Sequence, residues 1–195
     1  MKQLLLLALL ALNITSFGQT EINPKIKPDK DKEFVKAEVD RHAAELKTVA
    51  KNIWGYAELG FQETKSSQEL INLLKNAGFT INTGVSEMPT AFTATYGSGS
   101  PVIGILAEFD ALPGLSQDSV PVRKPAIDGR PGQGCGHNLF GAASSGAAIA
   151  LKEWLVKNKR QGTVRLIGTP AEEGGVAKLY MLRDGLFKDV DAILH

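Results

Sequence analysis

The sequence predicts an α/β fold in which helices flank a mixed, largely parallel sheet. Short apolar runs bounded by Gly, Pro and Ser alternate with segments of helical periodicity, and this alternation favours parallel strands joined by helices. Polar clusters also follow the ends of three apolar runs: Glu108 and Asp110, Glu172 and Glu173, and His195. The carboxyl ends of parallel strands share one edge of a sheet, where ligands bind. Residues far apart in the chain can therefore meet at that edge.

Composition excludes one class of partner. The chain has 195 residues, of which 43% are hydrophobic and 22% charged, as expected for one globular domain or one and a half. Its 22 Lys and Arg residues against 21 Asp and Glu residues leave a net charge of +1. No basic stretch is interleaved with aromatic residues, so we do not expect a nucleic-acid partner.

The amino-terminal residues predict export. Met1-Lys2 precedes an apolar run over residues 4–12 and the small residues Ser16 and Gly18, which indicates a signal peptide over residues 1–18. The run is shorter than the roughly 20 residues that span a bilayer. We expect a periplasmic or secreted protein with no membrane association after cleavage, and an uncleaved membrane anchor is the alternative. Residues 19–32 predict a linker, and residues 33–195 the folded part.

Two helices should come first in the folded part. From Glu33 onward, apolar residues recur at steps of three and four, which predicts a long amphipathic helix. A second helix is bounded by a capping box, Ser66-x-x-Glu69, and by Gly78 at its end.

Strands are predicted over residues 79–81, 91–96 and 102–107, and the last is apolar throughout, as in a strand buried on both faces. The long Pro- and Gly-rich segment over residues 116–134 should be functional or disordered. Asn138 can cap a following helix whose small residues predict a closely packed neighbour. A strand over residues 163–168, a helix over residues 177–183 and a core strand over residues 190–194 complete the order.

Half of a metal site is indicated by the glycine-rich stretch over residues 132–138, which holds the only cysteine, Cys135, and also His137. Both side chains could bind one ion from a single turn. In an exported protein, a lone cysteine is otherwise a buried inert thiol or half of an intermolecular disulfide. A third chemistry would make Cys135 a nucleophile with His137 as its base.

The other half should be Glu172-Glu173. Adjacent glutamates usually lie on a solvated surface, but this pair follows an apolar strand and precedes Gly-Gly. One carboxylate can then bind metal while the other acts as general base on the attacking water. Asp110 would accept a hydrogen bond from a ligand imidazole and fix its tautomer, and a simple turn residue is the equal alternative.

Three motifs occur in order: Ala-Glu-Phe-Asp-Ala-Leu-Pro-Gly-Leu-Ser over 107–116, Gly-Cys-Gly-His-Asn over 134–138 and Gly-Thr-Pro-Ala-Glu-Glu-Gly-Gly over 168–175. Together they resemble the amidohydrolase branch of the metallopeptidase family that contains aminoacylases and carboxypeptidase G. Tyr-Ala-Glu-Leu-Gly-Phe over 56–61 resembles the family's opening segment. Asn138 and the Leu-Pro-Gly-Leu-Ser run are most similar to enzymes acting on aminobenzoyl-glutamate.

This resemblance implies a catalytic domain with two divalent metal ions, zinc or manganese, that hydrolyses the amide of an N-acyl amino acid or short peptide. By position, Cys135, His137 and Glu173 would be metal ligands, and Glu172 the general base and later proton donor. With Glu172, Asp110 is the second predicted catalytic residue, through its hydrogen bond to a ligand imidazole. Thiolate favours zinc, and carboxylates tolerate manganese. Gln133 stands where many relatives have His, which leaves the substrate open.

The resemblance also implies that residues 33–195 are the N-terminal part of the catalytic domain, that this chain alone binds metal poorly and turns over little, and that the full-length protein is a homodimer. His195 should neighbour the site without binding metal. The rival hypothesis is a noncatalytic exported α/β module that binds an acyl-amino acid or a metal.

Overall fold

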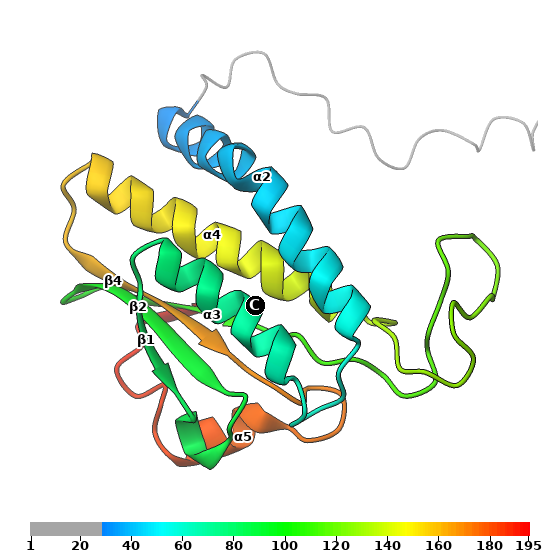
Figure 1. Ribbon diagram of the computed structural model, residues 1–195. Coiled ribbons are helices and arrows are strands. Elements are labelled where there is room, and N and C mark those ends of the chain that lie inside the picture. Colours follow the sequence, from blue (N-terminus) through cyan, green and yellow to red (C-terminus); the bar gives the residue numbers. More distant parts are fainter. Residues whose placement is uncertain (1–28) are drawn as a thin grey trace, which may run out of the picture.

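A five-stranded sheet forms the centre of the protein (Figure 1). The computed structural model describes residues 29–195; the predicted signal peptide and the linker up to residue 28 lie outside them. The strands are β1 (Thr80–Thr83), β2 (Phe92–Ser98), β3 (Val102–Ala107), β4 (Gly162–Gly168) and β5 (Ala192–Leu194). Their order across the sheet is β1-β2-β4-β3-β5.

The sheet is mixed and largely parallel, as predicted. Strand β3 pairs in parallel with both β4 and β5, whereas β2 pairs antiparallel with β1 and β4. Four of the five strands therefore share one direction, and β2 alone runs against them.

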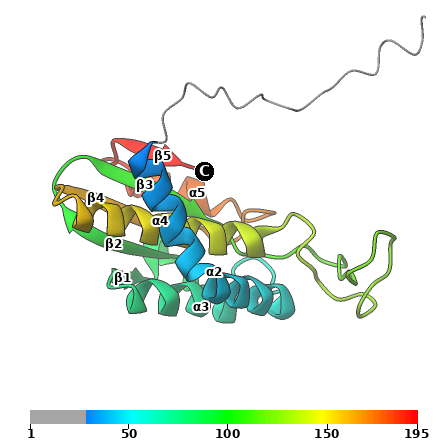
Figure 2. The same cartoon turned by 90° about the horizontal axis from the view of Figure 1, so that it is seen from above.

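Helices cover both faces of the sheet (Figures 1 and 2). They are α2 (Lys30–Tyr56), α3 (Thr64–Asn76), α4 (His137–Lys157) and α5 (Ala177–Arg183), with a short 3₁₀ helix η1 (Val85–Glu87). The first three enclose the larger hydrophobic core on one face, and α5 and η1 pack with a smaller core on the other. Within residues 29–195, none of these helices has the length and apolar character that crossing a membrane requires.

Helix α2 is the predicted amphipathic helix. Its buried face includes Leu46, Val49 and Ile53. It begins at Lys30 rather than at Glu33, where the linker was predicted to end, because the Asp29 carboxylate accepts hydrogen bonds from backbone N–H groups of the first turn.

The predicted capping box of α3 is wrong. The helix begins at Thr64, so Ser66 already lies within its first turn. The carboxylate that accepts first-turn N–H groups is that of Glu58, at 3.1 and 2.8 Å. Glu69 instead accepts hydrogen bonds from side chains of α2. An acidic residue brought close by the preceding loop has replaced the local cap.

The small residues of α4 allow the close packing that the sequence predicts. A Cβ at Gly141 would lie 2.7 Å from the Glu108 carbonyl oxygen, and one at Gly146 would lie 2.7 Å from Leu46 Cδ1. Helix α4 is thus pressed between the sheet and α2.

Asn138 does not cap α4, contrary to the prediction. The helix begins one residue earlier, at His137, after Gly136 in the left-handed region at φ 87°. The Asn138 backbone N–H donates to Gln133 Oε1 at 3.0 Å, and its side-chain amide donates to the Ala50 carbonyl oxygen at 3.1 Å. Gln133 therefore supplies the acceptor at this helix end.

Strand β5 is shorter than the predicted strand over residues 190–194 and lies at the edge of the sheet formed by the described residues. It covers only Ala192–Leu194, and Ile193 and Leu194 are 43% and 58% exposed. Sheet pairing on one side with β3 holds it.

Candidate metal centre

The ends of β3 and β4 bring two of the predicted polar clusters together. Ala107 and Gly168 are register partners in the parallel pair, so the chain leaves both strands at the same edge of the sheet. Glu108 and Asp110 follow one strand, and Glu172-Glu173 lie in the turn after the other. The Gly141 contact brings the first turns of α4, which begins at His137, against the same edge.

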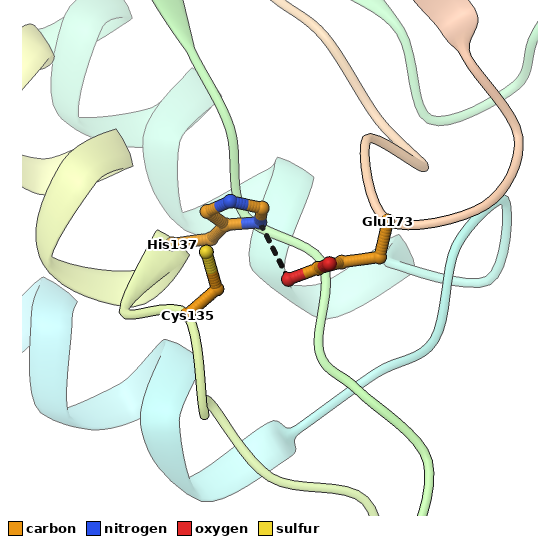
Figure 3. A group of neighbouring side chains, drawn as sticks. All are labelled: Cys135, His137 and Glu173. Atoms are coloured by element: carbon orange, nitrogen blue, oxygen red, sulfur yellow. Dashed lines mark ion pairs between the residues drawn. The ribbon is translucent and has the colours of Figure 1, made fainter.

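Cys135, His137 and Glu173 converge at this edge (Figure 3). One candidate ligand atom from each lies within 4.8 Å of the others, and His137 Nδ1 is 4.0 Å from Glu173 Oε1. Cys135 is exposed and unpaired within the chain. The alternative of a buried inert thiol is therefore wrong.

Glu173 contains a buried atom that protein groups leave unsatisfied. Among the described residues, its Oε1 is the one buried side-chain oxygen or nitrogen without a hydrogen-bond partner. Such an atom is costly unless something compensates it. Thiol, imidazole and carboxylate are also the donor types that bind zinc and similar divalent ions. On both grounds these three residues fit a divalent metal ion.

Asp110 joins the two halves of the site. It is 1% exposed, its Oδ1 lies 2.8 Å from His137 Nδ1, and its Oδ2 accepts the Glu173 backbone N–H at 3.0 Å. The first contact is the one that the predicted role of orienting the imidazole requires. The second was not anticipated, and it fixes the backbone of another candidate ligand.

The His137 ring lies between two carboxylates. Its Nε2 is 3.0 Å from Glu108 Oε2, opposite the Asp110 contact. Burial lowers the pKa of His137, but hydrogen bonds and charge from Asp110 and Glu108 outweigh it and raise the pKa to about 10. Since metal binding requires a neutral imidazole, uptake of an ion here should release a proton.

Glu108 and Lys178 form a second polar cluster beside the first. Burial raises the pKa of Glu108, but hydrogen bonds from His137, Lys178 and His195 outweigh it and lower the pKa to about 2. One candidate ligand atom from each of Glu108, His137 and Glu172 also lies within 4.8 Å of the others. The Lys178 ammonium, however, already pairs with Glu108 and lies 3.9 Å from Glu172 Oε1.

The remaining candidates, Glu172 and His195, also lie at this edge of the sheet. The Glu172 side chain is 38% exposed, and its Oε2 is 3.9 Å from His137 Nε2. This leaves it accessible to water and substrate. His195 neighbours the site, as expected, with Nε2 2.8 Å from Glu108 Oε1 and its ring edge-on to Phe140.

Sequence reasoning missed Lys178 and left Glu108 without a role. Lys178 is the second residue of α5, directly after the glutamate turn. A lysine at the start of a helix that follows two candidate site carboxylates is a usable signal. Its partner Glu108 lies 70 residues earlier, so only the folded chain shows the pair.

Comparison with known proteins identifies the family of the chain. Residues 104–195 match peptidase family M20/M25/M40. One of the subunits of p-aminobenzoyl-glutamate hydrolase from Escherichia coli is 43% identical over 162 residues, covering 83% of this chain and 34% of the relative. The human Xaa-Arg dipeptidase is 28% identical over 171 residues, covering 80% of this chain and 36% of the relative.

A solved structure shows the same fold. A dinuclear metal-binding peptidase of the M20 family from Bacillus subtilis superposes with a TM-score of 0.60 at 29% identity, covering 81% of this chain and 42% of that one. The chain spans about a third of the length of the two curated relatives. The resemblance inferred from the three motifs is confirmed: the chain belongs to the M20 family of peptidases.

Proposed function

We propose that this chain carries the catalytic residues of a metal-dependent amidohydrolase that cleaves the amide bond of an N-acyl amino acid or short peptide. The observation that carries the proposal is the convergence of Cys135, His137 and Glu173 around the unsatisfied Glu173 Oε1, next to the accessible Glu172. The Escherichia coli relative makes an aminobenzoyl-glutamate-like amide the first substrate to test.

Cys135, His137 and Glu173 would hold the ion. The proposed number of two ions, zinc or manganese, is supported by the dinuclear Bacillus subtilis relative. When bound, a divalent ion supplies Lewis-acid polarisation of the scissile carbonyl and makes the attacking water more acidic.

Glu172 performs the proton transfers in this proposal. One carboxylate oxygen takes a proton from the attacking water as the bond from oxygen to the carbonyl carbon forms. The same carboxyl then gives that proton to the amide nitrogen as the carbon–nitrogen bond breaks, which yields a carboxylic acid and an amine. Asp110, whose Oδ1 lies 2.8 Å from His137 Nδ1, holds the orientation of the imidazole ring throughout.

Location and assembly are further proposals. We propose that the mature protein is periplasmic or secreted, on the basis of the signal-peptide pattern over residues 1–18, and that the full-length protein is a homodimer, on the basis of the family resemblance. Cell fractionation and light scattering of the purified full-length protein test these two statements.

Elemental analysis combined with hydrolysis of an aminobenzoyl-glutamate-like amide tests the function. Both are measured on this chain and on a form extended through the coding sequence that follows it, because the chain spans about a third of its curated relatives. We expect bound metal and chelator-sensitive hydrolysis, with both strongest in the extended form. Absence of metal and hydrolysis from both forms would contradict the proposal.

Two variants assign the roles. Glu172→Gln should keep metal and lose hydrolysis, and Cys135→Ala should lose metal. Glu45→Gln, whose side chain is 51% exposed on α2, is the matched control and should change neither. Metal binding without hydrolysis in the unmodified protein would favour the noncatalytic module. Hydrolysis that survives chelation and disappears in Cys135→Ala would favour the thiol nucleophile.

A further inference from the structure

Glu63 is a buried carboxylate outside the candidate metal centre. It directly precedes α3 and is 0% exposed. Both oxygens accept hydrogen bonds from neutral donors: Oε1 from the Ala171 backbone N–H at 2.7 Å, and Oε2 from the Thr90 hydroxyl at 3.0 Å. A charged group is costly to bury, so a carboxylate at this place needs an explanation.

One of these donors, the Ala171 N–H, lies in the turn that carries the candidate base Glu172 and the candidate ligand Glu173. Ala171 is fully buried and has a φ of 53°, in the left-handed region that alanine seldom adopts. Its carbonyl oxygen accepts from the N–H groups of Gly175 and Val176 at 2.8 and 2.9 Å, which closes the turn around Glu172 and Glu173. Such a conformation persists only where its surroundings enforce it.

The segment that contains Glu63 also packs against Ala171 through Gly60. A Cβ at Gly60 would lie 2.8 Å from Ala171 Cβ, and a Cβ at Gly175 would lie 2.7 Å from the same atom. The two segments are therefore in contact at Ala171 Cβ, beside a pocket that Gly60, Ala171 and Gly175 help to line. If the carboxylate acceptor were removed, the Ala171 N–H would lose the protein group that accepts its hydrogen bond.

We propose that Glu63 is a positioning residue: by accepting the Ala171 N–H, it fixes the turn that directs Glu173 toward Cys135 and His137 and places Glu172 beside them. The turn-holding role stands on the geometry alone. Its consequence for metal binding rests on the proposed function.

The structure offers variants that separate positioning from general stabilisation. Glu63→Met keeps the length of the side chain and removes the acceptor. In Glu63→Gln, the amide oxygen can still accept from Ala171 while the amide N–H donates to the Thr90 hydroxyl. Thr90→Val is the matched control, because it removes the other hydrogen bond of the same carboxylate and leaves the Ala171 bond in place.

Two readouts on the 195-residue chain test the proposal without enzyme activity. Hydrogen exchange of peptides covering residues 169–176 reports the turn, and competition with a chromophoric chelator reports Zn²⁺ affinity. For Glu63→Met we expect exchange about tenfold or more faster in this segment and Zn²⁺ affinity about 10- to 100-fold weaker. Glu63→Gln should restore both, and Thr90→Val should leave both within about twofold while lowering the melting temperature.

A folded Glu63→Met with unchanged exchange over residues 169–176 would overturn the proposal. So would a Thr90→Val that loosens this segment as much. If Glu63→Met does not fold, Glu63→Asp takes its place, since the shorter side chain withdraws from Ala171 while keeping its charge, and an unchanged turn there counts equally against the proposal. Failure of both the unmodified chain and the extended form to bind Zn²⁺ contradicts the proposed function, whereas the exchange pattern still decides the role of Glu63.

Discussion

The turn over residues 169–176 and the loop over residues 115–131 are held by opposite kinds of contact. In the turn, backbone N–H groups donate to buried acceptors on other elements: Thr169 to Ala107, Ala171 to Glu63, and Glu173 to Asp110. The loop extends away from the sheet and helices (Figure 1), and many of its hydrogen bonds are internal and exposed, such as those of the Gln117 and Asp118 side chains.

This difference places the fixed geometry of the site in the turn. A buried donor without a partner costs about 1–3 kcal/mol, because no water replaces the lost acceptor, so each buried bond selects one conformation. An exposed bond competes with water and selects much less. The contacts that hold Glu172 and Glu173 in place are therefore those of the turn. The loop can vary in shape without moving these two residues.

The largest effect should follow from removing Asp110, which bonds both His137 and the turn. Asp110→Ala leaves a buried imidazole and a backbone N–H without their acceptor, and we expect a loss of about 3 kcal/mol in the free energy of unfolding, as for a broken buried ion pair. Urea denaturation measures it. Asp110→Asn, which keeps one acceptor oxygen and the volume, should lose less. A loss in Asp110→Ala no greater than in an exposed control such as Glu45→Gln would show that the turn is held by other means.

A smaller effect should follow from crowding the turn. A Cβ at Gly175 would lie 2.3 Å from Phe61 Cε2 and 2.7 Å from Ala171 Cβ. Phe61 can rotate, whereas Ala171 is fixed on both sides, so Gly175→Ala should cost about 2 kcal/mol. The adjacent Gly174 has no atom within 4 Å of its Cβ position. Gly174→Ala should be nearly neutral, and equal melting temperatures for the two variants would show that the turn adjusts freely.

The third prediction concerns the pH dependence of stability through Glu63. Burial raises the pKa of Glu63 above 4.5, against the opposing effect of its hydrogen bonds. A carboxyl group whose pKa is higher in the folded state contributes stability that is fully present below its unfolded pKa. That stability is lost as pH rises through the folded pKa. Glu63→Gln stays neutral, so its stability relative to the unmodified protein should increase from about pH 4 upward. Denaturation curves across this range measure the difference, and a constant difference would contradict a raised pKa.

Much of this arrangement could be predicted from sequence. Apolar residues over 102–107 predicted a strand with the bounds that β3 has. The polar clusters after β3 and β4 met because parallel neighbours end at one edge. The grouping of Cys135 and His137 with Glu173 followed from that topology together with the glycine-rich turn before α4. These predictions rest on local patterns and on one rule about parallel sheets.

What could not be predicted depends on contacts between distant residues. Glu63 bonds Ala171 across 108 residues, and nothing in its polar neighbourhood marks it as buried. The capping box at Ser66 and Glu69 has the right local pattern, yet Glu58 reaches the first-turn N–H groups and Glu69 bonds α2. A local sequence pattern predicts which hydrogen bonds a residue can form. Which of the competing partners lies close enough depends on the tertiary structure.

The smallest effect should come from the loop. The Lys124 ammonium, 2.7 Å from Asp118 Oδ2, and the Ser119 N–H lower the pKa of Asp118. A carboxyl group whose pKa is lower in the folded state contributes stability above its unfolded pKa. That contribution is lost as pH falls through the folded pKa. Because the pair is exposed, Lys124→Gln should raise the Asp118 pKa in a carboxyl NMR titration, as added salt should, without a measurable change in melting temperature. A drop in melting temperature comparable to that of Gly175→Ala would mean that the loop is coupled to the fold as firmly as the turn. Burial would then not explain why the hydrogen bonds of the turn hold Glu172 and Glu173 more firmly than exposed bonds hold the loop.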